Sequence, residues 1–182
     1  MTERQKLTPL NYALLGLVLR KPATGYAIRK IFETTPIGNY SSSQGSIYPA
    51  MASLVRKGLI ETIKGERGKG LFHITDAGRR AFESWLCLPV DPKDLSTAML
   101  RFPFLEGRPD LTAAFLTSFE TAALSEKQAL QEFIESPAGQ SLSRQSQVAV
   151  IYGIRNLESA ANWAEWARGD RLIDSAASYP KS

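Results

Sequence analysis

Two short strand-like segments flank a turn rich in glycine and lysine in residues 59–74, and this feature most constrains the fold. The first segment reads LIETI, the turn KGERGKG and the second segment LFHI. β-Branched and aromatic residues on either side of such a turn indicate a β-hairpin. Apolar residues in the surrounding sequence recur with a helical period. We therefore expect a mainly α chain that contains this hairpin.

Three helices are predicted ahead of the hairpin. The first follows Thr8-Pro9, where threonine suits the cap and proline suits the first helical position. The third ends at Gly58, and Pro49 is expected within its first two turns, where some backbone donors lack helical partners. Its buried face is predicted to comprise Ile47, Ala50, Met51, Leu54 and Val55. The three helices are predicted over residues 8–20, 24–35 and 43–57.

A fourth helix is expected after the hairpin, with Thr75 as its cap and Trp85 on its apolar side. Three helices, a hairpin and a closing helix in residues 1–86 make a winged helix-turn-helix arrangement, α-α-α-β-β-α. In that arrangement the second helix of the helix-turn-helix enters the major groove of DNA. Residues 1–86 are therefore predicted to form a DNA-binding domain.

The rest of the chain is also predicted to be helical. Two long helices are expected at 110–135 and 140–168, because their apolar residues recur at near-helical spacing. Two helices alone cannot enclose a core, so we expect them to pair with a second copy or to lie against the N-terminal unit. The predicted divisions are a linker at 87–109, a helical dimerisation domain at 110–170 and a loose tail at 171–182.

Charge is divided unevenly along the chain. Lys and Arg outnumber Asp and Glu by 13 to 6 in residues 1–85, whereas the acidic residues prevail by 12 to 9 in residues 86–182. A basic half suggests a polyanionic partner. The single cysteine, Cys87, and the single histidine, His73, exclude an intrachain disulfide, a zinc site and a Ser-His-Asp triad. We therefore expect no enzyme, metal or cofactor, and without a membrane segment we expect a cytoplasmic protein.

The exposed side of the third predicted helix carries the first candidate DNA contacts. Small residues there, such as Ala52, let the helix backbone approach the groove, and serine or glutamine side chains can bond base edges or phosphates. Alternatively, the serines are only loop and cap residues, and the tyrosine packs on a neighbouring helix. The candidates are Ser42, Ser43, Gln44, Ser46, Tyr48, Pro49, Ser53 and Arg56.

Further candidate contacts lie on the hairpin turn and on the second helix. Lys64, Arg67 and Lys69 are separated by glycines and can place three cations along a phosphate backbone. A solvated turn is the alternative. Tyr26 and Arg29 on the second helix can contact phosphates beside the groove, or can belong to a solvated face. The glycines do not match a nucleotide-binding loop, because no Lys-Ser or Lys-Thr follows them.

An aromatic concentration marks the last helix, where Trp163 and Trp166 accompany Tyr152 and Asn162. These residues can line a pocket for a flat apolar effector, or they can anchor a dimer. Core or dimer packing is the preferred interpretation for the two tryptophans. Ordinary packing or surface exposure is likewise the preferred interpretation for His73.

Three segments of the chain resemble the PadR family of bacterial transcriptional regulators. They are LTPLNYALLGLVLRKPATGYAIRKIFE at 7–33, SSSQGSIYPAMASLVRKGLIE at 41–61 and ITDAGRRAFESWL at 74–86. The C-terminal half is similar to the helical dimerisation domain of the subgroup that includes virulence-gene activators, through MLRFPFLEG at 99–107 and NWAEWA at 162–167. The family's wing usually carries tyrosines where this chain has Leu71, Phe72 and His73, so a phosphate contact by a wing tyrosine is not carried over.

The resemblance implies a sequence-specific transcriptional regulator that binds double-stranded DNA. In such proteins the C-terminal helices clasp a partner chain to form a homodimer, so that two recognition helices face successive major grooves of a palindromic site. Family members often act as repressors and some act as activators, and the resemblance does not choose between the two. Some respond to phenolic acids or drugs, so a small aromatic or apolar effector is a further expected partner. The alternative interpretation is an adaptor that keeps the winged helix but binds another protein instead of DNA.

Overall fold

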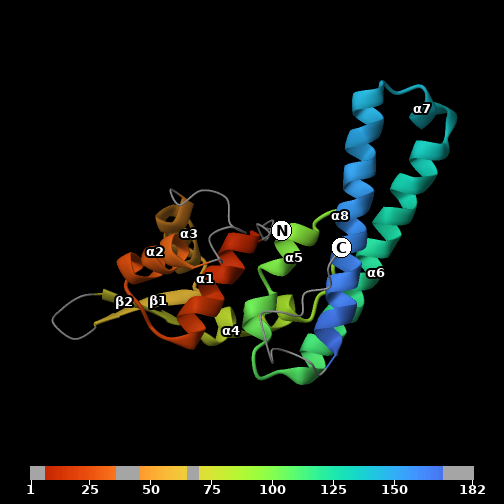
Figure 1. Cartoon of the computed structure of the whole chain (residues 1–182). Helices are drawn as coiled ribbons and strands as arrows, with labels where there is room; N and C mark the ends of the chain where they lie inside the picture. The colour runs from red at the N-terminus through yellow and green to blue at the C-terminus, as the bar shows by residue number, and fades with distance from the viewer. Residues whose placement is uncertain (1–6, 36–45, 65–69, 170–182) are drawn as a thin grey trace, which may run out of the picture. The chain divides into compact units, whose positions relative to one another are not determined.

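The computed structural model of the chain describes residues 7–35, 46–64 and 70–169. These residues form two compact units (Figure 1). The N-terminal unit comprises the described residues up to 88 together with 96–107, and the C-terminal unit comprises 89–95 together with the described residues from 108 onward. The residues predicted as a linker, 87–109, are thus shared between the two units.

The N-terminal unit has the predicted order of three helices, a hairpin and a closing helix, so the winged helix-turn-helix class is confirmed. The predicted start of the third helix, at residues 43–45, lies outside the described residues. A helical turn within the predicted linker is also present. The elements are α1 (Pro9–Arg20), α2 (Gly25–Thr34), α3 (Ile47–Arg56), β1 (Ile60–Lys64), β2 (Gly70–Ile74), α4 (Asp76–Leu86), α5 (Leu95–Met99) and a 3-10 turn, η4 (Phe102–Leu105).

Threonines begin three of these helices. Thr8 Oγ1 accepts the Asn11 backbone N–H at 3.3 Å, and Asn11 Oδ1 accepts the Thr8 backbone N–H at 3.0 Å. The side-chain oxygens of Thr24 and Thr75 each accept a backbone N–H from three residues later, at 3.2 and 3.1 Å. Each bond satisfies a donor that the helix itself leaves without a partner. The predicted caps at Thr8 and Thr75 are confirmed.

Gly58 ends α3 and turns the chain into β1. Its φ of 66° lies in the left-handed region, which side-chain-bearing residues rarely adopt. The Gly58 N–H donates to the Val55 carbonyl at 2.9 Å. The Leu59 N–H donates to the Leu54 carbonyl at 3.0 Å, which completes a Schellman motif. The predicted stop of the helix at Gly58 is therefore confirmed.

The hairpin has a backbone partner that the sequence did not indicate. β1 and β2 pair antiparallel, from Ile60 opposite Ile74 to Lys64 opposite Gly70. Ala23, between α1 and α2, exchanges two backbone hydrogen bonds with Phe72, at 3.3 and 2.9 Å. β2 therefore has partners on both sides. A single bridged residue leaves no alternating pattern in the sequence, which is why this pairing was missed.

Aromatic rings packed on α1 form much of the core of the N-terminal unit. A β-carbon on Gly16 would lie 2.5 Å from Phe104 and 2.7 Å from Phe82, so only glycine permits this close packing. Tyr12 stacks on Trp85 with ring centroids 4.9 Å apart, and burial raises the pKa of the Tyr12 phenol above its ordinary value of 10.0. Because Phe104 belongs to this core, residues 96–107 join the N-terminal unit.

Arg101 holds the segment before η4 against the end of α4. Its side chain is buried, and its guanidinium donates to the carbonyl oxygens of Trp85, at 3.3 Å, and of Leu88. The last carbonyls of a helix lack helical partners, and a positive charge there is favourable. Burial lowers the pKa of the Arg101 guanidinium. This buried cation was not predicted, because arginine is rarely buried and its spacing gives no sign of it.

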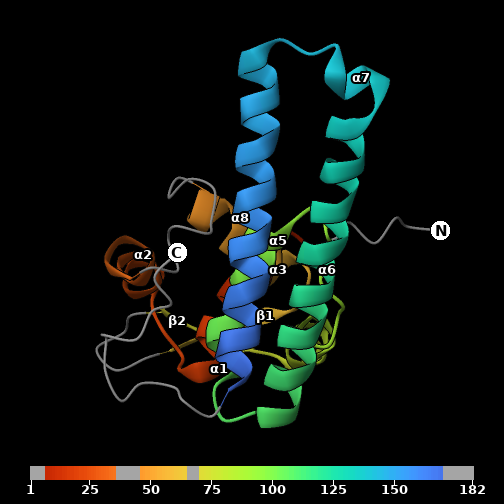
Figure 2. The ribbon, with the colours of Figure 1, turned by 45° about the vertical axis from the view of Figure 1, so that its right-hand side comes forward.

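Two long antiparallel helices lie side by side in the C-terminal unit (Figures 1 and 2). They are α6 (Pro109–Glu135) and α8 (Arg144–Arg168), and the short α7 (Pro137–Gln140) lies between them in the chain. α8 begins at Arg144 rather than at the predicted residue 140, because Ser143 Oγ accepts the Ser146 backbone N–H at 3.3 Å and caps the helix there. The two predicted long helices are otherwise confirmed.

Packing and ion pairs join α6 to α8. Phe119 of α6 meets Trp163 of α8 edge to face, with ring centroids 5.4 Å apart. Lys127 Nζ lies 2.7 Å from Glu158 Oε1, and this bond holds the pKa of the Glu158 carboxyl below its usual value. Arg168 forms a second ion pair with Glu120. The small buried residues of the two helices are Ala122, Ala123, Ala161, Ala164 and Ala167.

Gly78 provides a test of the packing between α4 and the turn that follows α3. A β-carbon on Gly78 would lie 2.0 Å from the backbone carbonyl oxygen of Leu59, which cannot move aside as a side chain can. We expect Gly78→Ala to lower the free energy of unfolding by about 3 kcal/mol, measured by urea denaturation with circular dichroism. Ala77→Ser, at the exposed neighbouring position, is the control and should change it by less than about 0.5 kcal/mol. Equal changes in the two variants would contradict the close packing.

Candidate nucleic-acid interface

α3 presents a row of small side chains and one arginine to solvent. Pro49, Ala52 and Arg56 are all exposed, and their spacing of three and four residues places them on one face of the helix. The opposite face is buried in the core, and Pro49 lies in the first turn as predicted. Val55, which was predicted to be buried, is 38% exposed because it lies at the edge of the apolar stripe. The exposed row is the face of α3 that can meet a partner.

The serine candidates differ in position. Ser46 directly precedes α3, is half-buried and makes no side-chain cap to the helix. Ser53 is half-buried on the flank of the exposed row. Ser42, Ser43 and Gln44 lie outside the described residues. Two of the serines are therefore placed beside the exposed face of α3, and the other candidates of this segment stay predictions.

Tyr48 packs on the start of α2 and is still 49% exposed. A β-carbon on Gly25 would lie 2.9 Å from Cε1 of Tyr48 and 3.6 Å from the ring of Phe72. The missing side chain at Gly25 thus makes room for the tyrosine ring between α2 and β2. The packing interpretation of Tyr48 is confirmed, and its DNA contact stays a prediction, for which about half of the residue is accessible beside α3.

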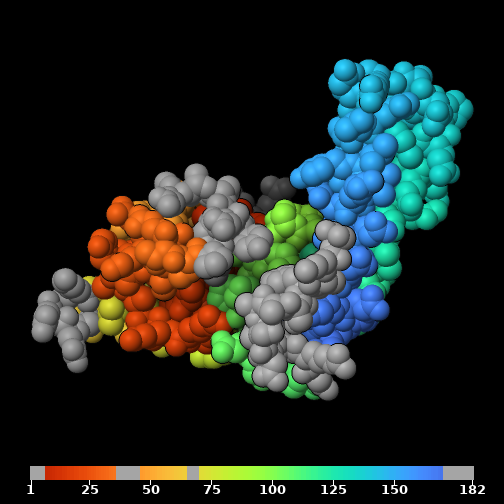
Figure 3. Space-filling model, in the orientation of Figure 1, coloured from red at the N-terminus to blue at the C-terminus, as the bar shows by residue number. Residues whose placement is uncertain are grey.

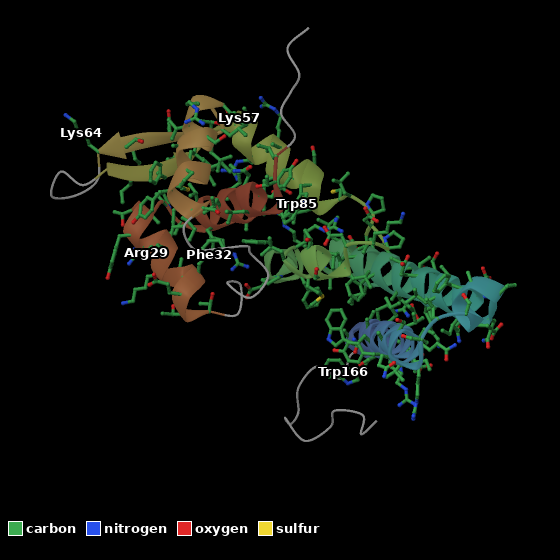
Figure 4. All side chains as sticks on the ribbon, turned by 90° about the horizontal axis from the view of Figure 1, so that it is seen from above. Arg29, Phe32, Lys57, Lys64, Trp85 and Trp166 are labelled. Atoms are coloured by element: carbon green, nitrogen blue, oxygen red, sulfur yellow. The ribbon has the colours of Figure 1, made fainter. Side chains whose placement is uncertain are left out.

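α2, orange in Figure 3, carries an exposed aromatic ring and two cations, of which Arg29 is labelled in Figure 4. Tyr26 is 65% exposed, and the Arg29 guanidinium lies 6.0 Å from the centre of its ring. Arg29 Nε also lies 3.0 Å from Glu33 Oε1, one helical turn further on. Lys30 is exposed and forms no ion pair within the part of the chain that the structure describes. Arg29 is therefore restrained on the helix surface, whereas the charge of Lys30 is available.

Lys64 lies at the turn end of the hairpin, and its side chain points away from the strands in Figure 4. Lys64 is exposed, and it pairs with Gly70 in the strand register. Arg67 and Lys69 lie outside the described residues. Glu61 and His73 face each other across the strands, with His73 Nδ1 3.7 Å from Glu61 Oε1. His73 is thus half-buried beside a carboxylate, as expected for a packed surface residue.

The exposed cations of the N-terminal unit that were not selected from the sequence include Lys57, Arg79 and Arg80. Lys57 follows the last residue of α3 (Figure 4), where a positive charge complements the helix dipole. Arg79 and Arg80 lie on the exposed side of α4. All three contribute to the basic charge of residues 1–85. The total charge indicated a basic surface, but only the burial of the opposite side of α4 shows which of its residues face solvent.

The four aromatic and polar candidates of α8 do not form one cluster. Trp163 packs on Phe119 of the C-terminal unit, and both Trp163 and Trp166 are half-buried. Tyr152 is 68% exposed and precedes Trp163 by 11 residues, or about 16 Å along the helix axis. Asn162 is exposed. The arrangement favours core packing for Trp163 over a common effector pocket.

Large apolar side chains are exposed on both long helices. On α8, Val148, Ile151 and Tyr152 share a face, because they are spaced three and four residues apart. Val148 is 56% exposed and Ile151 is 44% exposed. On α6, Leu124 is 46% exposed and Phe133 is 40% exposed. Leu124 and Phe133 are nine residues apart, which places them on opposite sides of α6. The name apolar helix surface is used below for the three residues of α8.

Two further classes of site find no support in the described residues. No group of three or more His, Cys, Asp or Glu side chains there is arranged to hold a metal ion. Among the same residues, no helix combines the length and the apolar character needed to cross a membrane. Cys87 is exposed at the end of α4.

Comparison with known proteins finds matches to the N-terminal unit. Residues 14–84 match the family described as "Transcriptional regulator PadR-like family". The chain is 32% identical over 81 residues to "Negative transcriptional regulator PadR" of Bacillus subtilis (strain 168), covering 42% of this chain and 44% of the relative. It is also 32% identical over 74 residues to "Transcriptional regulator YqjI" of Escherichia coli (strain K12), covering 41% and 36%. The match spans less than half the length of either relative.

Solved structures give weaker likenesses over more of the chain. Bacillus subtilis PadR in complex with operator DNA has a TM-score of 0.40 and 21% identity, covering 90% of this chain and all of that chain. The Vibrio cholerae virulence activator AphA has the same TM-score and identity, covering 87% of this chain and 93% of that chain. Scores this low support no conclusion about the C-terminal unit.

Substitution of Trp163 tests whether its ring packs in the C-terminal unit or lines a ligand pocket. We expect Trp163→Ala to lower the free energy of unfolding by about 3 kcal/mol, because it removes the ring that packs on Phe119. The matched control is Asn162→Ala, at the exposed neighbouring position, which should change it by less than about 0.5 kcal/mol. Both values come from urea denaturation followed by circular dichroism. A Trp163→Ala variant as stable as the control would exclude a structural role for this ring.

Proposed function

We propose that the chain, whose residues 14–84 form a PadR-like domain, is a sequence-specific transcriptional regulator that binds double-stranded DNA as a homodimer. The matching family is one of transcriptional regulators rather than enzymes. The observation that carries the proposal is the exposed row of Pro49, Ala52 and Arg56 on α3. α3 is the second helix of the helix-turn-helix, the one that enters the major groove.

Arg56 is suited to direct contact with bases. It is exposed and forms no ion pair with any residue that the structure describes, so its guanidinium can reach the O6 and N7 acceptors of guanine. The hydroxyl groups of Ser46, Tyr48 and Ser53 flank the row and can bond phosphates or base edges. Together these side chains would fix the position of α3 in the groove.

α2 and the hairpin would contact the phosphate backbone on either side of α3. In a helix-turn-helix, the first helix crosses the backbone, and α2 presents Tyr26 and Lys30 there. Glu33 would hold the Arg29 guanidinium, which in turn would orient the ring of Tyr26. At the hairpin, Lys64 is exposed, and the predicted cations Arg67 and Lys69 follow it in the sequence. Phosphate contacts of this kind supply affinity without sequence preference.

Dimerisation is proposed to occur through the apolar helix surface. Its three large side chains are exposed on one face of α8, and two helices cannot by themselves enclose a core. A second copy supplies a matching apolar surface through a twofold axis. Two recognition helices would then meet a palindromic operator whose half-sites lie about one helical turn apart.

The direction of regulation and the effector belong to the same proposal. Repression is favoured, because the B. subtilis relative is named a negative transcriptional regulator. Gating by a small aromatic or apolar effector stays a prediction of the sequence. A regulator of transcription would act in the cytoplasm. The second candidate, an adaptor without DNA affinity, has no observation of its own in its favour.

The deciding experiment is selection of bound sequences from random double-stranded DNA at two salt concentrations. Enrichment of a palindrome is the expected result, and absence of binding at both concentrations would contradict the proposal and favour the adaptor. Arg56→Ala should weaken binding to the selected site by about 1–3 kcal/mol and relax its sequence at one position in each half-site. Arg144→Ala, which removes an exposed cation from the C-terminal unit, is the matched control and should change neither.

The cations of the wing should set the salt dependence of binding. Replacing Lys64, Arg67 and Lys69 by alanine should weaken binding to all DNA sequences. It should also reduce the slope of log affinity against log salt by about 0.9 for each phosphate that the variant no longer neutralises. Fluorescence anisotropy with the selected operator and with unrelated DNA measures both effects. Lys93→Ala with Arg144→Ala serves as the charge control, and an unchanged slope in the wing variant would remove the wing from the interface.

A charge on the apolar helix surface should separate the dimer. We expect Ile151→Glu to give a folded monomer, because a buried unpaired carboxylate is costly. Analytical ultracentrifugation measures the mass, and circular dichroism checks the fold. Ala114→Glu introduces the same charge at the exposed start of α6, outside this surface, and should remain a dimer. Dimers of the Ile151→Glu variant would place the interface elsewhere.

A further inference from the structure

We infer that α3 reads its operator largely through the methyl groups of thymines. This inference rests on the proposed function and names the base contacts of the same helix face. Pro49 and Ala52 lie on the exposed face of α3, one helical turn apart. Neither side chain has a polar atom, so neither can donate or accept a hydrogen bond at a base edge.

The composition of α3 restricts the other ways of reading bases. Between Ser46 and Lys57 the chain contains no Asn, Gln, Asp, Glu or His. Asparagine and glutamine are the side chains that pair with adenine by two hydrogen bonds, and the carboxylates accept from cytosine N4. Within this part of the described chain, two-bonded recognition of a base is left to the cations, and Arg56 is the one in the exposed row.

The shape of the exposed face suits a methyl group. Proline and alanine are small, so the backbone of α3 can approach the floor of the major groove closely. Thymine is the base that presents a methyl group there, at C5, and apolar side chains recognise it by contact. The half-exposed ring of Tyr48 extends this apolar face on the side of α2 and β2. Thymine methyl groups packed against Pro49 and Ala52 would thereby be removed from contact with water.

The operator should therefore contain A·T pairs opposite Pro49 and Ala52, and a G·C pair opposite Arg56. The preference at the A·T pairs would depend on the methyl group itself rather than on hydrogen bonds. This distinguishes it from recognition by a glutamine, for which the adenine of the same pair is read. Gln44, just ahead of α3, is the one nearby residue with that chemistry.

The test replaces each thymine of the selected operator by deoxyuridine, one position at a time. Deoxyuridine lacks only the methyl group, so base pairing and the other groove atoms are kept. At each contacted thymine we expect the dissociation constant to rise about fourfold, because the favourable burial of one methyl group is lost. Fluorescence anisotropy with the full chain measures each constant. Equal affinity for all substituted operators would overturn the inference.

A variant of α3 then assigns the methyl contact. The rise in the dissociation constant on replacing thymine by deoxyuridine is called the penalty. In Ala52→Gly, one contacted position should lose this penalty, because the alanine methyl group that touched the thymine methyl has been removed. Pro49→Ala should do the same at the adjacent position, which keeps the test valid if the glycine variant fails to fold. Lys64→Ala is the control: it should bind every operator more weakly and keep the full penalty at each thymine.

The outcomes separate the inference from the function on which it rests. Penalties that Ala52→Gly or Pro49→Ala removes support the inference. Penalties that persist in both variants overturn it, and assign the methyl contact to another residue. Tight binding without any penalty overturns it and leaves the DNA-binding regulator intact. A chain that binds no DNA in the selection experiment overturns the proposed function itself.

Discussion

The turn at Gly58 and Leu59 is the contact on which the rest of the N-terminal unit depends. Thr75 Oγ1 donates to the Gly58 carbonyl at 2.7 Å, and the Thr75 N–H donates to the Leu59 carbonyl at 3.1 Å. The end of α3, the start of β1 and the start of α4 thus share one anchor. In the proposed function α3 and the hairpin would meet the same DNA, and their common attachment would set the angle between them. Glycine at 58 and 78 makes the turn and its close packing sterically allowed.

Specificity and affinity would come from different parts of this scaffold. In the exposed row of α3 only Arg56 has a polar side chain. The row would therefore discriminate bases by its shape and by the Arg56 guanidinium. The cations of α2 and of the hairpin would act on phosphates, which carry no sequence information directly. Arg29 illustrates how local pairing changes a residue's role, since Glu33 and the ring of Tyr26 already hold it. A count of basic residues cannot show this difference.

Local signals were predictable because their partners lie nearby in the chain. Helix ends are marked by Thr8 with Pro9, by Thr75 and by Gly58. The hydrogen bonds at these ends join residues at most five positions apart. The candidate site was partly predictable for the same reason, since helical spacing alone places Pro49, Ala52 and Arg56 on one face. Spacing could not show that Tyr48 packs on Gly25, nor that Tyr152 and Trp163 differ in their exposure and surroundings.

By itself, the sequence determined the order of helices and strands, the class of the N-terminal unit and the face of α3 that is free of large apolar residues. These properties follow from local backbone preferences and from the period of burial. Only the tertiary structure decided that Ala23 pairs with Phe72, that Arg101 is buried against the end of α4, and that residues 96–107 join the N-terminal core. Each of these depends on groups far apart in the chain, and such contacts are selected by close packing and hydrogen-bond satisfaction rather than by any repeat in the sequence.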